Sequence, residues 1–357
     1  MTIPKILKPK DPRFSCGPTK KPEGWSLEKL NSLFLGRYHR SNDVKKYISK
    51  QLSRMGEALE IPDKFKVFLV PGSCTGAIEA IIWSLLGDRK ISTFIYDYWG
   101  MTWYQDMKKL NYNIDCRLSL DGSMPNLDNI DNSNDLVFVW SGTTTGMSIN
   151  KLDFLDPNHE GLVISDVTSA AFIYDLPWDK IDVAVFSWQK ALGSESQHGI
   201  VVMSPKAISR LKKKPVPKVF DFLHYNYLIN TPSLLAISDF ELCLDLYEKN
   251  GGLKGSNRIC KENKSVLDVW VKKNHYVKKF VKEKKYEALS PSYFTFTRKF
   301  NYDEFFNFMN KNKIAHDIRN YRMANAGIRV WTGPTIKKND LIALTNWLDW
   351  SLNKFIR

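Results

Sequence analysis

Residues 181–190, which read IDVAVFSWQK, are the most informative part of this 357-residue chain. The first six form an apolar run with two valines and an isoleucine, a pattern that predicts a buried β-strand. Lys190 follows four residues after the run ends. Because open α/β sheets bind their ligands just beyond the carboxyl ends of their strands, we expect the amine of Lys190 to lie at a ligand site.

A second strand signal precedes this one along the chain. The apolar run 162–165 (LVIS) ends at Asp166. A carboxylate and an amine on two such strand ends are the groups that pyridoxal phosphate requires, since the carboxylate pairs with the pyridine nitrogen and the amine forms a Schiff base. We therefore predict pyridoxal phosphate as the cofactor, with Lys190 and Asp166 as catalytic residues.

The alternation of short apolar runs with segments of helical period dominates residues 65–215. This alternation predicts an α/β fold with a mostly parallel sheet covered by helices. Past about residue 235 the pattern changes to that of an α+β unit, with a final helix expected to be capped by Asn339. We expect a large cofactor-binding domain over residues 17–245 and a small domain formed by residues 1–16 and 246–357.

Three further segments near predicted strand ends suit the same cofactor. The loop 72–76 (GSCTG) enters a helix predicted from Ala77, and small residues at a helix N-terminus suit a phosphate. The turn 141–146 (SGTTTG) follows another strand, and Trp99 and Trp103 offer rings for stacking. Each segment alone is as typical of an ordinary turn or a core tryptophan. Their order along the chain favours one cofactor site.

The net charge of +14 raises a different class of function, nucleic-acid binding. Much of the charge lies in the lysine triplet 212–214 and in residues 272–285. In the second segment Val277, Phe280 and Val281 form an apolar stripe between lysines, which is typical of a solvated surface element. We predict no nucleic-acid partner, and note that a positive field also attracts an anionic substrate.

Cysteine usage and hydropathy limit the remaining possibilities. The five cysteines are scattered, with no CxxC pair and no His/Cys cluster, so we predict free thiols and no metal site. No apolar run approaches the ~20 residues that span a bilayer. The N-terminus lacks the pattern of a secretory signal. We expect a cytoplasmic protein with no membrane partner.

Seven motifs, taken in order, resemble those of one enzyme family. They are FSCGP at 14–18, GRYHRS at 36–41, VPGSCTGA at 70–77, DVTSA at 166–170, SWQK at 187–190, INTPS at 229–233 and GIR at 327–329. The chain resembles the phosphoserine aminotransferases of the class V aminotransferase group over essentially its whole length. The SWQK context argues against the aspartate aminotransferase branch, whose lysine usually follows Ser-x-Ser. The resemblance implies a fold-type I pyridoxal phosphate enzyme, with a mostly parallel seven-stranded sheet covered by helices in the large domain and a smaller α+β domain.

The resemblance also implies roles around the cofactor. Lys190 would carry the cofactor and move a proton between it and the substrate α-carbon, while Asp166 would pair with the pyridinium nitrogen. Trp103 would stack on the ring, and Thr143 would hydrogen-bond its oxygens. The cofactor phosphate would be bound by Cys74, Thr75 and Gln189 and, from the neighbouring subunit, by Asn230 and Thr231.

For the substrate, Arg329 matches the arginine that binds the α-carboxylate. His39 and Arg40 match a pair that binds the substrate phosphate across a subunit interface, which implies a homodimer. The sequence departs from the family pattern at two positions. Thr75 stands where many members have an arginine, and Arg322 where some have a histidine. We list Arg322 with the substrate-binding residues and expect the phosphate to be held differently here.

The activity implied is transfer of the amino group from L-glutamate to 3-phosphohydroxypyruvate, giving O-phospho-L-serine and 2-oxoglutarate in serine biosynthesis. The family also acts on the four-carbon analogue, 4-phosphohydroxy-L-threonine, of pyridoxine biosynthesis. Two alternatives stay open. One is a class V aminotransferase with an unphosphorylated acceptor such as glyoxylate, and the other is a basic nucleic-acid-binding or regulatory protein on the same scaffold.

Overall fold

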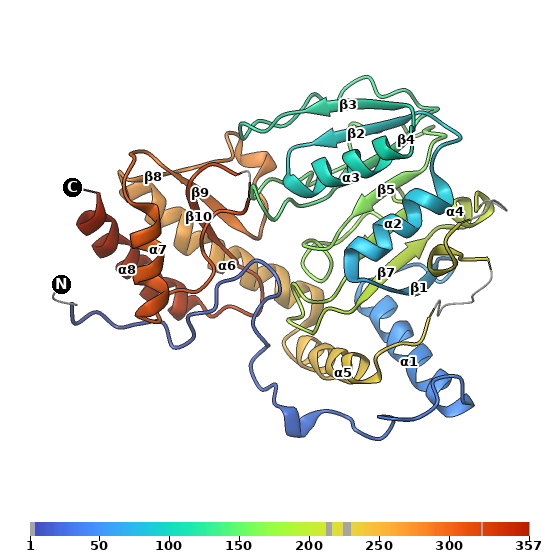
Figure 1. The fold of residues 1–357 in the computed structure, drawn as a ribbon, viewed down its shortest axis with the longest axis horizontal. Coiled ribbons are helices and arrows are strands. Elements are labelled where there is room, and N and C mark those ends of the chain that lie inside the picture. The colour runs from blue at the N-terminus through green and yellow to red at the C-terminus, as the bar shows by residue number, and fades with distance from the viewer. Residues whose placement is uncertain (1–3, 212–215, 224–229, 323, 357) are drawn as a thin grey trace.

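The computed structural model describes residues 4–211, 216–223, 230–322 and 324–356. Of the predicted features, the lysine triplet 212–214 and Ile229 of the INTPS motif lie outside the described residues. Figure 1 shows two lobes, one built on a large sheet and one containing both chain ends. The domain boundaries given above stay a prediction.

The large lobe is organised by a seven-stranded sheet, as predicted. Its strand order is β1-β7-β6-β5-β4-β2-β3, and β7 is antiparallel to both of its neighbours whereas the other pairs are parallel. The strands, in that order, are β1 (Lys66–Pro71), β7 (His198–Met203), β6 (Val183–Phe186), β5 (Val163–Asp166), β4 (Asp135–Val139), β2 (Ile91–Ile95) and β3 (Ile114–Leu118). The prediction of a mostly parallel seven-stranded sheet covered by helices is confirmed. Strand β3, with no fully buried residue, is the one that the apolar runs did not reveal.

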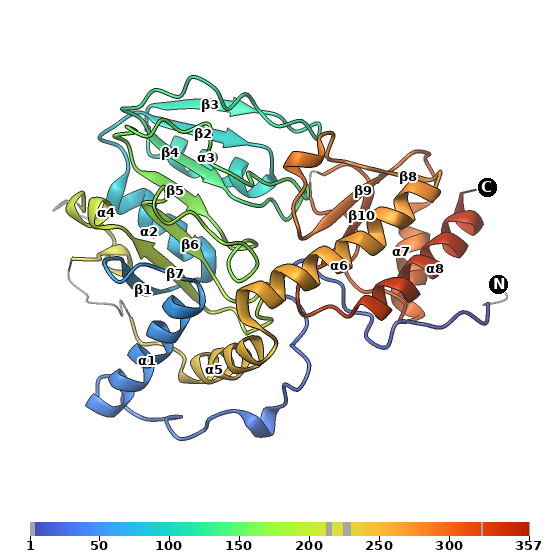
Figure 2. The ribbon, with the colours of Figure 1, turned by 180° about the vertical axis from the view of Figure 1, so that it is seen from behind.

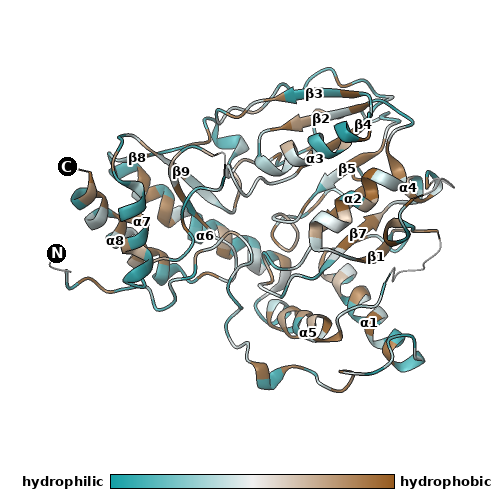
Figure 3. Cartoon of the chain, viewed as in Figure 1, coloured by the Kyte–Doolittle hydropathy of each residue, from teal (hydrophilic) through white to brown (hydrophobic). Residues whose placement is uncertain are grey.

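Alternate residues of the central strands enter two separate cores, as the pleat of a strand requires. Val183 and Val185 of β6 pack with α2 and α3, while Ala184 and Phe186 pack on the opposite face with α1 and α5. The helices of this lobe are α1 (Asn42–Ala58), α2 (Ser73–Leu85), α3 (Tyr98–Lys109), the short α4 (Pro205–Ser209) and α5 (Leu234–Lys249), with 3₁₀ turns at Leu27–Lys29 and Lys218–Phe220. In Figure 3, α2 is mostly hydrophobic whereas α1 shows both colours, which fits a partly exposed helix.

The small lobe is an α+β unit with the antiparallel strand order β10-β9-β8. Its elements are α6 (Gly252–Lys273), β8 (Val277–Lys279), a 3₁₀ turn (Lys284–Tyr286), β9 (Ser292–Phe296), α7 (Tyr302–Lys311), β10 (Gly327–Val330) and α8 (Lys338–Phe355). Figure 2 shows α6 running from one lobe to the other. The predicted cap of the last helix is wrong, because Asn339 lies inside α8 and the N-cap is Lys337, which makes no side-chain cap.

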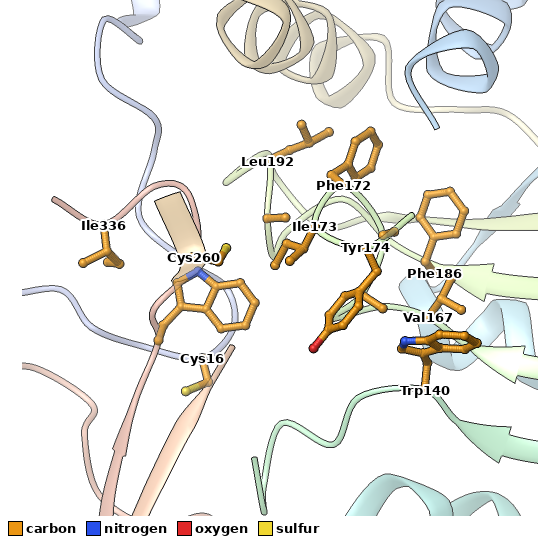
Figure 4. Packing of buried hydrophobic residues seen from close by; sticks show 14 of the residues in the cluster. Cys16, Trp140, Val167, Phe172, Ile173, Tyr174, Phe186, Leu192, Cys260 and Ile336 are labelled. Atoms are coloured by element: carbon orange, nitrogen blue, oxygen red, sulfur yellow. The ribbon is translucent and has the colours of Figure 1, made fainter. Parts of the chain in front are cut away.

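A layer of aromatic side chains joins the strand ends to the small lobe. It comes from the segment after β5, where Phe172 packs edge-on against Phe186 at 6.1 Å and Tyr174 packs against Trp140 at 6.5 Å. The Tyr174 hydroxyl accepts a hydrogen bond from the backbone of Leu289 in the small lobe. Figure 4 shows these rings beside the ends of the strands. Edge-to-face pairs of this kind fix the strand ends firmly.

Within the described ranges, no helix is both long enough and apolar enough to cross a bilayer. The same residues include no group of three or more His, Cys, Asp or Glu side chains placed to hold a metal ion.

Candidate active site

A cavity of about 270 Å³ lies where β4, β5 and β6 end. The register pairs Val139 with Asp166 and Asp166 with Val185, so that these three strands finish at one edge of the sheet. Seven of the predicted cofactor residues line the cavity, namely Cys74, Thr75, Trp103, Thr143, Asp166, Gln189 and Lys190. Cys74 and Lys190 are 116 positions apart in the sequence, and the parallel topology brings both to this cavity.

Lys190 is partly buried in the cavity, four residues beyond β6. Its Nζ donates a hydrogen bond to the carbonyl of Cys16 at 2.5 Å. Burial, helped by the charge of Arg329, lowers the pKa of the Lys190 amine to about 8. A lysine in this range has a sizeable neutral fraction near pH 7, which is the form that attacks a carbonyl and accepts a proton.

Asp166 is the last residue of β5 and is buried. Its carboxylate accepts hydrogen bonds from the Trp103 indole at 3.1 Å and from the backbone of Thr168 at 3.0 Å. Burial raises the pKa of Asp166, and these hydrogen bonds oppose that effect. No side chain among the described residues forms an ion pair with Asp166. A buried carboxylate in this state favours a cationic partner in the cavity.

Trp103 and Trp99 lie on one face of α3 with their rings stacked at 5.8 Å and 29°. The indole N–H of Trp103 donates to Asp166, and the indole N–H of Trp99 donates to the Thr143 hydroxyl at 3.2 Å. The prediction gave Trp103 a stacking role. Its hydrogen bond adds a second one, because it fixes the orientation of the Asp166 carboxylate.

The turn at Thr143 is positioned by Asp97, a residue that the sequence reasoning missed. Asp97 is 1% exposed and caps α3, accepting from the backbone of Trp99 at 2.9 Å. It also accepts from the backbone of Thr144 at 2.9 Å. Because of this cap, α3 begins at Tyr98. An Asp directly before an aromatic helix start was the available signal.

The loop 72–76 is already the first turn of α2, which begins at Ser73 and not at Ala77. Gly72 takes a φ of +85°, which glycine adopts without strain, and the carbonyl of Gln197 accepts from its N–H at 3.1 Å. Cys74 and Thr75 therefore sit in the helical turn whose N–H groups lack intrahelical acceptors. Together with the helix dipole, these N–H groups suit a phosphate.

Tyr321 lines the side of the cavity that faces the small lobe, and Arg329 lies against the Tyr321 ring. Arg329 donates to the carbonyl of Thr143 at 2.9 Å, and its guanidinium lies 5.1 Å from the centre of the Tyr321 ring. Arg322 lies 5.1 Å from the same ring and hydrogen-bonds the hydroxyl of Tyr98, but it is exposed and does not line the cavity. Tyr321 lines the cavity and was not predicted, because no motif marks it.

The N-terminal segment closes the cavity over Lys190. The Thr19 backbone donates to the carbonyl of Gln189 at 3.0 Å, and the Thr19 hydroxyl donates to the carbonyl of Lys190 at 2.5 Å. Gly17 has a φ of +145°, and a Cβ at this position would lie 2.4 Å from the Lys190 Nζ. The FSCGP motif thus has a steric reason for its glycine.

Besides Arg322 and Arg329, which do not line the cavity, four predicted residues lie outside it. His39 and Arg40 come just before α1, where His39 is partly buried and Arg40 is exposed. Asn230 and Thr231 are exposed and precede α5. The single chain therefore brings together the cofactor residues but not these four.

The donors and acceptors in the cavity fit pyridoxal phosphate. A partly buried amine, a buried carboxylate with no ion pair among the described residues and a helix N-terminus face one space, which matches the aldehyde, the pyridine nitrogen and the phosphate of that cofactor. The Gln189 Oε1 and the Arg329 Nε are also buried without a hydrogen-bond partner among the described residues. Buried polar groups are normally satisfied, so these two indicate a polar occupant.

Comparison with solved structures shows which class this fold belongs to. A pyridoxal phosphate-bound phosphoserine aminotransferase from Trichomonas vaginalis superposes with a TM-score of 0.80 at 17% identity, over 95% of this chain and 100% of that chain. A ureidoglycine-glyoxylate aminotransferase from Bacillus subtilis superposes with a TM-score of 0.83 at 13% identity, over 99% and 96%. The chain therefore has the fold of the fold-type I aminotransferases.

Sequence comparison narrows this class. No family model matches the chain. A phosphoserine aminotransferase from Methanosarcina mazei is 37% identical, over 96% of this chain and 97% of that relative. The chain belongs to the phosphoserine aminotransferase family, as its seven motifs predicted.

Proposed function

We propose that this protein is a phosphoserine aminotransferase. It transfers the amino group of L-glutamate to 3-phosphohydroxypyruvate, and the products are 2-oxoglutarate and O-phospho-L-serine. The observation that carries the proposal is the full-length similarity to phosphoserine aminotransferases at 37% identity. The placement of Lys190 and Asp166 on one cavity supports it.

Pyridoxal phosphate, when bound, supplies a carbonyl that takes up the amino group and a ring that withdraws electrons from the substrate α-carbon. Asp166, which lines the same cavity, would stabilise positive charge on the ring of the bound cofactor. Lys190 removes and returns the proton at the α-carbon. Because burial lowers its pKa to about 8, the amine serves as a base near neutral pH and is still readily protonated.

The substrate carboxylate would be held by Arg329, whose Nε lacks a hydrogen-bond partner in this structure. A planar guanidinium binds a carboxylate through two parallel hydrogen bonds. Tyr321 fixes the plane of Arg329 by a cation–π contact at 5.1 Å. Arg322, on the rim beside the same ring, replaces the cation that Thr75 does not provide in the phosphate loop.

The active form would be a homodimer, with His39 and Arg40 reaching the substrate phosphate and Asn230 and Thr231 the cofactor phosphate of the neighbouring subunit. Large apolar side chains are exposed around both pairs: Leu27 at 68%, Leu33 at 70%, Tyr38 at 65% and Leu235 at 53%. Apolar exposure of this kind favours burial against a second copy.

The position of the Asn230–Thr231 pair is limited by a hydrogen bond that the next segment of the chain makes. The backbone of Ser233 donates to His198, beside the Gln197 carbonyl that accepts from the turn before α2. The segment that carries Asn230 and Thr231 therefore lies close to the N-terminal end of α2, where the cofactor phosphate would bind. This supports its assignment to a phosphate site that two subunits share. We also propose a cytoplasmic location, a place in serine biosynthesis and activity on the four-carbon analogue of pyridoxine biosynthesis.

A second candidate is an aminotransferase that uses glyoxylate, because the ureidoglycine-glyoxylate enzyme has a closely similar fold. A single-turnover experiment separates the two. Protein loaded with pyridoxal phosphate is mixed with L-glutamate, and its absorbance is followed while either acceptor is added. We expect 3-phosphohydroxypyruvate to restore the starting spectrum at least about 100-fold faster than glyoxylate, since phosphate contacts are lost with glyoxylate. Equal rates would reject the proposed substrate.

A further inference from the structure

The N-terminal strap, residues 14–25, lies over Lys190, and its residues Gly17 and Pro18 line the cavity. Figure 1 shows the N-terminal segment leaving the small lobe and passing α5. The strap touches Lys190 through the carbonyl of Cys16 and covers it with Gly17. Its backbone also pairs with Gln189. These contacts place the strap but do not anchor its far end.

The anchor is Asp239 of α5, which is 2% exposed. On the strap side its carboxylate accepts hydrogen bonds from the Lys21 amine at 2.8 and 3.0 Å and from the Trp25 indole at 2.8 Å. On the other side it accepts from the Ser194 hydroxyl at 2.6 Å and from the backbone of Glu195 at 2.7 Å. One carboxylate thus joins the strap to the loop that follows Lys190.

The strap and this loop also touch directly. Gly193, with a φ of +66°, lies so close that a Cβ would come within 2.4 Å of the Lys20 carbonyl. Lys21 forms an ion pair with Glu195 at 2.8 Å. Burial alone would lower the pKa of Lys21, but its hydrogen bonds to Asp239 and Glu195 raise it above the ordinary value. The Lys21 amine therefore keeps its positive charge near neutral pH.

We propose that Asp239 is a positioning residue that clamps the N-terminal strap onto the loop 191–195 and so keeps the strap closed over Lys190. The inference goes beyond the proposed function, because it concerns access to the amine and not the identity of the substrate. Asp239 touches neither Lys190 nor the cavity. It acts through the two segments that it joins.

The clamp has a chemical consequence. The strap excludes water from Lys190, and burial is the main cause of the low pKa of that amine. The other groups that face the amine are the thiols of Cys16 and Cys74, the carboxylate of Asp166 and the guanidinium of Arg329. Of these, Cys16 belongs to the strap, whereas Cys74, Asp166 and Arg329 do not. Releasing the strap should therefore change the solvation of Lys190 and leave Asp166 and Arg329 in place.

Hydrogen–deuterium exchange of the full chain tests the clamp directly. In Asp239→Asn, which keeps the shape and removes the charge, we expect amides of residues 14–25 to exchange about tenfold faster. Exchange in α2 and in strands β4–β7 should not change. The matched control is Asp135→Asn. Asp135 is also fully buried and ion-paired, with Arg210 at 2.6 Å, but it lies at the opposite end of the sheet.

The pKa of Lys190 gives a second readout, which a merely structural role would not move. We expect it to rise by about one pH unit in Asp239→Asn, measured as the pH dependence of amine modification with the cofactor removed. Asp135→Asn should keep the wild-type value. Unchanged strap exchange, or a uniform increase over the whole chain, would overturn the proposal.

Two milder variants keep the test decisive if Asp239→Asn does not fold. Lys21→Met and Trp25→Phe each remove one strap-side donor and leave the hydrogen bonds of Asp239 to Ser194 and Glu195 intact. Each should speed exchange of the strap alone, by a few-fold, and wild-type exchange in both would reject the clamp. No substrate enters these measurements, so their failure is distinct from a failure of the proposed activity.

Discussion

The two ends of the candidate active site are built in different ways. At the cofactor end, Lys190, Asp166 and the first turn of α2 converge within one chain, because the sheet register brings their strand ends to one edge. At the substrate-phosphate end, His39 and Arg40 lie away from the cavity, in a segment with exposed leucines. One chain is enough to bring Lys190, Asp166 and α2 together at the first end, called the complete end below, whereas the role proposed for His39 and Arg40 at the second, incomplete end needs another copy.

The largest effect should come from the centre of the complete end. Under the proposed function, Lys190→Ala removes both the amine that would hold the cofactor and the base that would move the α-proton. We expect transamination to fall by about 10⁴-fold, the upper end of what a positioned acid–base group contributes. The absorbance of the bound cofactor should be lost or shifted. A variant with more than about a hundredth of wild-type turnover would contradict the assignment of Lys190.

Asp166→Asn tests the carboxylate at the same end. The amide cannot neutralise a pyridinium cation, so we expect turnover to fall by about 10²–10³-fold while cofactor binding is kept. Because the Trp103 N–H can still donate to the amide oxygen, the stacked tryptophans should stay in place. Turnover and a retained cofactor spectrum are measured together. Unchanged turnover would remove Asp166 from the catalytic residues.

The cofactor end was predictable because strand ends in a parallel sheet carry ligand-binding residues, so that Asp166 and Lys190 followed from apolar runs and what came after them. Asp97 and Asp239 could not be found in this way. Each is a buried carboxylate whose partners come from distant segments, such as Thr144 for Asp97 and Lys21 for Asp239. Nothing in the local pattern of an aspartate reveals which donors tertiary packing will bring to it.

Helix boundaries and surface residues are two other features that could not be predicted fully from the sequence. The start of α2 was placed four residues late, because a helix that begins with small polar residues has no apolar period in its first turn. Asn230 and Thr231 were assigned by resemblance alone, and in one chain they are simply exposed polar residues. The role proposed for them depends on a contact between subunits that no single-chain pattern encodes.

A complementation experiment tests the incomplete end. The double variant His39→Ala, Arg40→Ala should lose about 10–100-fold in kcat/KM for the phosphorylated acceptor, mainly through KM. When it is unfolded and refolded with an equal amount of Lys190→Ala, half of the dimers are mixed, and each mixed dimer holds one intact site. Activity should then return to about a quarter of the wild-type value. No recovery in dimers shown to be mixed would mean that both sets act within one subunit.

The smallest predicted effect is the pH dependence of cofactor capture by Lys190, at the complete end of the site. The pKa of Lys190 is lowered from its ordinary 10.5 to about 8, so the neutral amine is the minority form at pH 7 and the majority form at pH 9. Protein freed of cofactor should therefore capture pyridoxal phosphate about tenfold faster at pH 9 than at pH 7, with a plateau above. Stopped-flow absorbance measures this rate.

A charge variant sharpens the pH prediction, because two causes lower the pKa of Lys190. Burial is the larger cause, and the positive charge of Arg329 is the smaller one. Arg329→Gln removes only the second, so the midpoint of the capture rate should move to higher pH by less than the Asp239→Asn change, which acts on burial. A midpoint near 10.5 in the wild type would mean that water reaches the amine freely. In that case the strap does not close the cofactor end, and the contrast between the two ends of the site would be lost.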